Sequence, residues 1–104
     1  MGSRVERFAA LVQQHPKDER FRFSLAQALA VEERGGEAEA HFAFCAAKKP
    51  DWMMPRILLG KLLLVRGRAD EARPILEEAL QLAIEQHHED PEHELRDLLA
   101  EIRA

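Results

Sequence analysis

The sequence predicts an all-α protein built from antiparallel helix pairs that stack on one another. A fixed step of 34 residues relates Leu25, Ala26, Leu29, Ala38, Phe42 and Cys45 to Leu59, Gly60, Leu63, Ala72, Leu76 and Ala79. Within each segment the apolar residues follow helical spacing, and glycine or proline separates the segments. Such a period is typical of stacked units that cannot bury their apolar faces alone.

Six helices are expected, and the first two lie before residue 37. The first runs from about residue 4 to residue 15, with one apolar stripe, and Pro16 ends it. Asp18 is placed to cap the second helix, because its side chain accepts from the first free N–H groups. Gly35 and Gly36 are predicted to stop this helix, since glycine adopts the left-handed conformation readily.

The third helix is expected from about Glu37 to the lysines before Pro50, where cations complement the helix dipole. A fourth begins between residues 51 and 55, runs to about residue 66, and is stopped by Gly67. Proline is tolerated there because the first turn has N–H groups without helical partners.

The fifth helix begins near residue 69 and extends as far as residue 87. Asp90 as cap and Pro91 as first residue are then expected to open a sixth helix. Its apolar positions have clean helical spacing at Leu95, Leu98, Leu99 and Ile102. Short turns between these helices favour antiparallel neighbours.

Composition narrows the classes of function. The 104 residues carry a net charge of -4 with both signs mixed along the chain, which disfavours nucleic-acid binding because that needs a basic stripe. A single cysteine, Cys45, rules out an intramolecular disulfide and favours a reducing, cytoplasmic setting. The longest apolar run, residues 57–65, is too short to span a membrane and is interrupted by Gly60 and Lys61.

No catalytic constellation is found, and we expect a protein that is not an enzyme and needs no cofactor or metal. Ser24 has no base at a suitable spacing, and the repeat places Cys45 at a helix crossing as a small inert residue. The ligand-like cluster at His87, His88, Glu89, Asp90 and His93 has no known metal spacing. It is interpreted as a solvated turn between helices.

The pattern Leu59-Gly60-x2-Leu63, followed by Ala72, Leu76 and Ala79, resembles the tetratricopeptide repeat family, in small bacterial-type form. The resemblance implies one right-handed solenoid domain with a half repeat at 4–16, repeats at 19–52 and 53–86, and a capping helix at 91–103. Arg22 and Arg56 stand where the family often has Trp. Arg96 falls on the small position of Ala26 and Gly60, which suits a helix that nothing crosses closely.

In this family the first helix of each pair lines a concave groove that binds a partner peptide or helix. The repeat step transfers this role to Arg20, Phe23, Gln27, Met54, Ile57, Lys61, Leu64, His93 and Asp97. The partner is expected to be a protein with an apolar contact face, while the groove charges of both signs do not reveal the partner's charge. Lys61 and Asp97 are placed to pair with each other.

Two alternatives stay open at this point. Ile57 and Leu64 are equally compatible with a position in the core, because core edges and exposed apolar patches look alike in sequence. The same apolar face, together with Trp52, Met53 and Met54, is also compatible with the closure of a homodimer instead of peptide binding.

Overall fold

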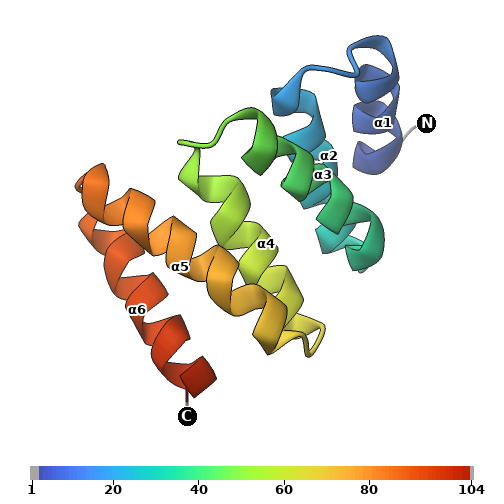
Figure 1. Cartoon of the computed structure of the whole chain (residues 1–104). Helices are drawn as coiled ribbons and strands as arrows, with labels where there is room; N and C mark the ends of the chain where they lie inside the picture. Colours follow the sequence, from blue (N-terminus) through green and yellow to red (C-terminus); the bar gives the residue numbers. More distant parts are fainter. Residues whose placement is uncertain (1–2, 104) are drawn as a thin grey trace. The chain divides into compact units, whose positions relative to one another are not determined.

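In the computed structural model, residues 3–103 are described and form six α-helices joined by short turns, with no strand among them (Figure 1). The helices are α1 (Arg4–Gln14), α2 (Glu19–Val31), α3 (Gly35–Lys48), α4 (Met53–Val65), α5 (Ala69–Glu85) and α6 (Glu89–Arg103). The predicted all-α fold is confirmed. The chain divides into two compact units, unit 1 (Met1–Pro50) with α1 to α3 and unit 2 (Asp51–Ala104) with α4 to α6.

The helix boundaries repeat the step that the sequence contains. Helix α4 begins and ends 34 residues after α2, and α5 begins 34 residues after α3. Helix α6 begins 36 residues after α4, as the displaced apolar pattern of the last segment predicts. Within unit 1 the contacts join α1 to α2 and α2 to α3, and within unit 2 they join α4 to α5 and α5 to α6.

Each helix pair meets through small side chains that leave room for one large neighbour. In unit 1, Ala26, Ala38 and Cys45 are fully buried beside the buried ring of Phe42. In unit 2 the fully buried positions are Ala72, Ala79 and Leu76, next to the buried Gly60 of α4. Small residues at a crossing let two helix backbones approach closely, so that the large residues can interdigitate.

Gly60 is the tightest of these contacts. A Cβ atom added at Gly60 would lie 2.3 Å from Cδ2 and 2.6 Å from Cγ of Leu76. Leu76 is 0% exposed, so its side chain has no open space into which it can move. The glycine of this position is therefore required by packing and not by backbone conformation.

Three turns between helices share one stop. Glu33, Gly67 and His87 have positive φ angles of 61°, 76° and 58°. In each turn the next N–H donates across the helix end, as from Arg34 N to Leu29 O at 2.8 Å, which is the Schellman arrangement. The prediction that Gly35 and Gly36 stop α2 is therefore wrong: both lie in the first turn of α3, and Glu33 takes the left-handed conformation.

The last helix begins earlier than predicted. Asp90 and Pro91 are the second and third residues of α6, so Asp90 is not the N-terminal cap. Leu95 and Leu99 are buried, while Arg96 is exposed and pairs with Glu92 of its own helix at 3.0 Å. The exposed Arg96 agrees with the expectation that no helix of unit 2 crosses α6 closely at this position.

The two arginines that replace the family's Trp are accommodated differently. The Arg22 guanidinium lies 4.1 Å from the ring centroid of Phe44 on α3, and its Nε donates to Pro16 O at 2.9 Å. The Arg56 Nε donates to Glu78 of α5 at 3.1 Å. Phe44 and Glu78 are themselves 34 residues apart, so each arginine reaches the same position of the paired helix.

We predict that Gly60→Ala destabilises the protein by about 1–3 kcal/mol, because the added methyl group overpacks the contact with Leu76. Denaturant unfolding measures the change. Gly36→Ala is the control, since Gly36 is exposed in the first turn of α3 and alanine is the better helix former. A Gly60→Ala protein as stable as the parent would show that α4 and α5 do not approach this closely.

We also predict that Glu33→Gly stabilises the protein by about 0.5–1 kcal/mol, because glycine removes the cost of a left-handed conformation at a residue with a Cβ atom. Gly67→Ala, at the equivalent position, should be destabilising by about 1 kcal/mol for the same reason. Thermal and urea unfolding of the two variants should move in opposite directions. Shifts of the same sign would refute the shared turn.

Candidate functional site

The predicted groove residues of unit 1 lie on α2. Arg20 and Gln27 are exposed, and Phe23 is half-buried. The Phe23 ring meets the buried ring of Phe42 edge-on, with centroids 6.0 Å apart. Arg20 is engaged by Asp18 through two hydrogen bonds, of which the shorter is 2.7 Å. Phe23 is thus part of the packing between α2 and α3 and presents only part of its ring to solvent.

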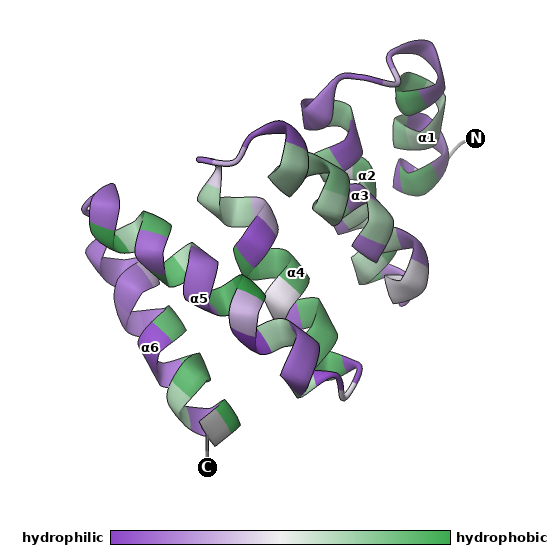
Figure 2. Ribbon diagram, viewed as in Figure 1, coloured by the Kyte–Doolittle hydropathy of each residue, from purple (hydrophilic) through white to green (hydrophobic). Residues whose placement is uncertain are grey.

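In unit 2 the predicted α4 residues separate into core and surface. Ile57 is 2% exposed, so its side chain belongs to the core and the groove assignment does not hold for it. Met54 is 40% exposed, and Lys61 and Leu64 are half-buried. Figure 2 shows hydrophobic residues along much of α4, which agrees with its apolar sequence. The other dimer candidates differ as well, since Met53 is buried and Trp52 half-buried.

An ion pair links the surfaces of α4 and α6. The Lys61 Nζ lies 2.9 Å from Glu94 Oε2, so the predicted pairing of Lys61 with Asp97 is wrong. Both side chains are about half exposed, and the pair is worth at most about 1 kcal/mol in solvent. Its importance is geometric, because it brings the outer surface of α4 next to that of α6. His93 and Asp97 are exposed on the same helix as Glu94.

We call this surface the α4–α6 face. Its members come from helical positions that share one side of each helix, and they are Met54, Leu58, Lys61, Leu64 and Val65 on α4 with Asp90, His93, Glu94, Asp97 and Glu101 on α6. Sequence reasoning missed Val65, which is 85% exposed, although Val31 recurs there after 34 residues and is 75% exposed. It also missed Glu94, one helical turn before Asp97.

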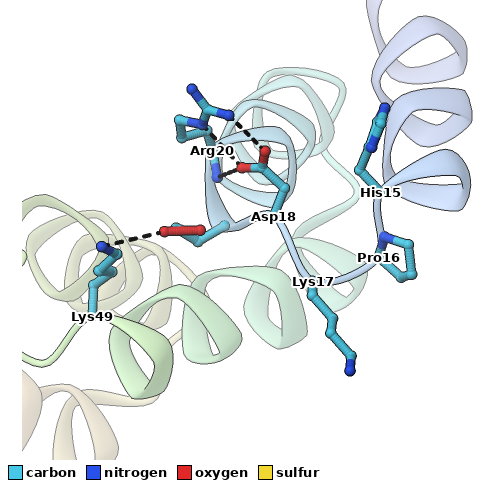
Figure 3. Close-up of a pocket in the computed structure, with 7 residues that line it drawn as sticks. His15, Pro16, Lys17, Asp18, Arg20 and Lys49 are labelled. Atoms are coloured by element: carbon cyan, nitrogen blue, oxygen red, sulfur yellow. Dashed lines mark hydrogen bonds and ion pairs between the residues drawn. The ribbon is translucent and has the colours of Figure 1, made fainter.

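An open hollow of 680 Å³ lies at the turn between α1 and α2, and its lining includes the end of α3 (Figure 3). Its cations are already engaged: Arg20 faces the Asp18 carboxylate and Lys49 reaches Glu19 at 3.6 Å. Lys17 points away from the Asp18–Arg20 pair in Figure 3. The Lys48 ammonium donates to Lys17 O and holds the turn against α3. The hollow is therefore a tied turn and not a converging charged site.

The titratable groups inside unit 1 are unsuited to catalysis. Burial raises the pKa of the Cys45 thiol to about 11, and nearby Glu19 raises it further, while the Sγ donates to Glu19 O at 3.3 Å. Burial also lowers the pKa of His41, and Arg22, whose Nη1 lies 3.5 Å from His41 Nδ1, lowers it too. Glu37 opposes this shift. An unionised, buried thiol is inert, as the repeat position of Cys45 predicts.

The histidine-rich turn between α5 and α6 is exposed from His87 to Asp90. A shallow hollow of 340 Å³ lies over it. Within residues 3–103, no group of three or more His, Cys, Asp or Glu side chains is placed to hold a metal ion. His87 serves the fold, because it is the left-handed residue that ends α5.

None of the helices in the described part of the chain combines the length and the apolar character that crossing a bilayer requires.

We predict that stability falls between about pH 4 and pH 2 in part because of Asp18. The hydrogen bonds from Arg20 hold the pKa of this carboxyl at about 2, below its ordinary 3.8. A lowered folded-state pKa means that the contribution is complete above the unfolded pKa and is lost as pH falls through the folded one. Asp18→Asn keeps the cap oxygen but cannot titrate, so its urea midpoint should fall less over this range. Parallel curves for the two proteins would refute the assignment.

The comparisons with known proteins agree with the geometry. Residues 53–78, which span α4 and the first part of α5, match the sequence model of the tetratricopeptide repeat family. This is the copy that the residue pattern marks as the closer one, with Gly60 against Leu76 at its centre. None of the curated proteins and none of the solved structures matched the chain significantly. The chain is a tetratricopeptide repeat protein.

Proposed function

We propose that this protein is a non-catalytic interaction module that binds a partner peptide or helix on the α4–α6 face. Tetratricopeptide repeats generally serve as protein–protein interaction modules, and residues 53–78 form such a repeat. The observation that carries the proposal is the exposure of Met54 and Val65, at 40% and 85%, on a helix whose other apolar residues are largely buried. An exposed apolar patch with a polar rim is typical of an interaction site.

The composition of the face explains how a partner would be held. Met54, Leu58 and Val65 offer apolar area, and burial of such area contributes about 25 cal/mol per Å² before the cost of ordering the partner. The Lys61–Glu94 pair fixes two polar groups beside this area, so a partner meets oriented charges and not mobile ones. Apolar contact supplies affinity, and the charges set the register of the partner.

Unit 1 offers a related but weaker surface. The α2 residues Arg20, Gln27 and Val31 occupy the positions of Met54, Lys61 and Val65, and Val31 is 75% exposed. Arg20 is engaged by Asp18, and Phe23 is engaged by Phe42. The α2 surface therefore contributes a secondary contact in this proposal, and the α4–α6 face contributes the principal one.

Self-association is the competing use of the same face. A homodimer closed by Met54 and Val65 would have twice the 11.9 kDa mass of the chain. Mass measurement by light scattering over a dilution series separates the two uses, and the proposal expects the mass of one chain throughout. A dimer that persists on dilution and is broken by Met54→Ser/Val65→Ser would replace partner binding with self-association.

We predict that Met54→Ser/Val65→Ser weakens partner binding about tenfold or more, equivalent to about 1.4 kcal/mol. Both side chains are exposed, so unfolding stability should change by less than about 0.5 kcal/mol for each. The measurement is recovery of partners from an extract of the producing cells on immobilised wild-type and variant protein.

Two controls define the result. Ile84→Ser alters an exposed apolar residue of α5 outside the face and should leave partner recovery unchanged. Ile57→Ala should instead destabilise the protein by about 2–5 kcal/mol, because Ile57 is in the core. Partners that bind the double variant and the wild type equally well would place the site elsewhere.

A further inference from the structure

The two units differ in charge. Residues 1–50 hold eight Lys and Arg against seven Asp and Glu, while residues 51–104 hold seven against twelve. The net charges are therefore +1 and -5. The negative charge of the chain is thus a property of unit 2, the unit that carries the α4–α6 face.

Much of this charge lies in one stripe of α6. Asp90, Glu94, Asp97 and Glu101 follow each other at steps of four, three and four residues, so they share one side of the helix, and all four are exposed. The buried Leu95 and Leu99 lie on another side. Arg96 does not neutralise the stripe, because it pairs with Glu92. Lys61 is the counter-charge that the structure places on it, at Glu94.

The acidic stripe and the apolar patch occupy equivalent positions of two neighbouring helices. A step of 36 residues relates Asp90, Glu94, Asp97 and Glu101 to Met54, Leu58, Lys61 and Val65. The Lys61–Glu94 pair at 2.9 Å shows that the two surfaces adjoin. The face is therefore apolar along α4 and negative along α6.

We infer that the α4–α6 face binds a basic amphipathic segment of another protein, with apolar side chains against Met54 and Val65 and Lys or Arg side chains against Asp97 and Glu101. This inference rests on the proposed function and adds the chemistry of the partner. Charge complementarity favours a cationic segment, since a like-charged partner would meet a repulsive stripe. Long Lys and Arg stems also add apolar contact beside the charge.

A second copy of the chain does not supply such a segment. The cations of unit 1 that could meet the stripe are already used: Arg20 pairs with Asp18, Arg34 with Glu37, and Lys49 with Glu19. Arg34 forms a forked contact with distances of 2.7 and 2.8 Å, and this contact holds the pKa of Glu37 below its usual range. Releasing these cations would break internal pairs, so the partner is a different protein.

The test is a selection of random 16-residue peptides displayed on phage against the full chain at physiological salt. Enriched peptides are expected to carry apolar residues at helical spacing and a net positive charge. Affinities of the selected peptides are then measured by fluorescence anisotropy. Asp97→Lys/Glu101→Lys should raise the dissociation constant about tenfold or more, and Lys61→Glu should lower it severalfold. Binding should also weaken as salt screens the charges.

The matched control is Glu32→Lys/Glu33→Lys in unit 1. It makes the same change in net charge at two exposed glutamates away from the face, so binding should change less than about twofold. Circular dichroism of every variant must remain helical, which separates a binding effect from unfolding.

The outcomes distinguish the two proposals. Enriched peptides that are neutral or acidic, yet lose affinity for Met54→Ser/Val65→Ser, would overturn the basic partner and leave the interaction site in place. Peptides insensitive to every variant of the face, or no enrichment at all, would overturn the interaction site as well. Basic peptides that respond equally to the control pair would show attraction to net charge alone and would also overturn the inference.

Discussion

The close approach of paired helices is the constraint on which the rest of the structure depends. In unit 2 it is achieved by Gly60, since the Leu76 side chain occupies the space where a Cβ atom would lie. In unit 1 the equivalent pair is Ala26 and Phe42, both buried. The two units thus satisfy one packing requirement with different partners, because the residue on one helix must leave the volume that its neighbour fills. The bounds of the helices follow from this contact and from the turns that close each pair.

Once that contact is fixed, the positions beside it can vary in chemistry. Arg22 and Arg56 occupy the same place in the repeat, and each lays its apolar stem toward the paired helix. The partner there is the Phe44 ring in one unit and the Glu78 carboxylate in the other, so a cation–π contact replaces an ion pair. A single residue type is accommodated twice because a guanidinium accepts both a ring face and a carboxylate as neighbour.

The sequence predicted the fold well because periodicity and burial are collective signals. The 34-residue step located five of the helix starts within about two residues, and the step of 36 residues located the last helix. The stop of α2 was missed because hydrogen bonding across the helix end, and not glycine content, decides which residue adopts the left-handed conformation. The equivalence of Glu33 with Gly67 contained the missing signal.

The site was harder to predict than the fold, for physical reasons. Ile57 and Met54 lie three residues apart on one helix, and a rotation of less than one turn separates a core side chain from an exposed one. A lysine stem reaches carboxylates one helical turn apart, so spacing alone did not decide between Asp97 and Glu94 as the partner of Lys61.

The repeat separates the residues that hold the protein together from those that face a partner. Positions equivalent to Gly60 must stay small wherever another helix crosses, whereas positions equivalent to Met54 and Val65 face solvent and can change without disturbing the core. In α4 those outward positions are mostly apolar, and in α6 the same positions are acidic. Because the stabilising contacts lie on other sides of both helices, the chemistry of the α4–α6 face reflects what it contacts and not what the fold requires.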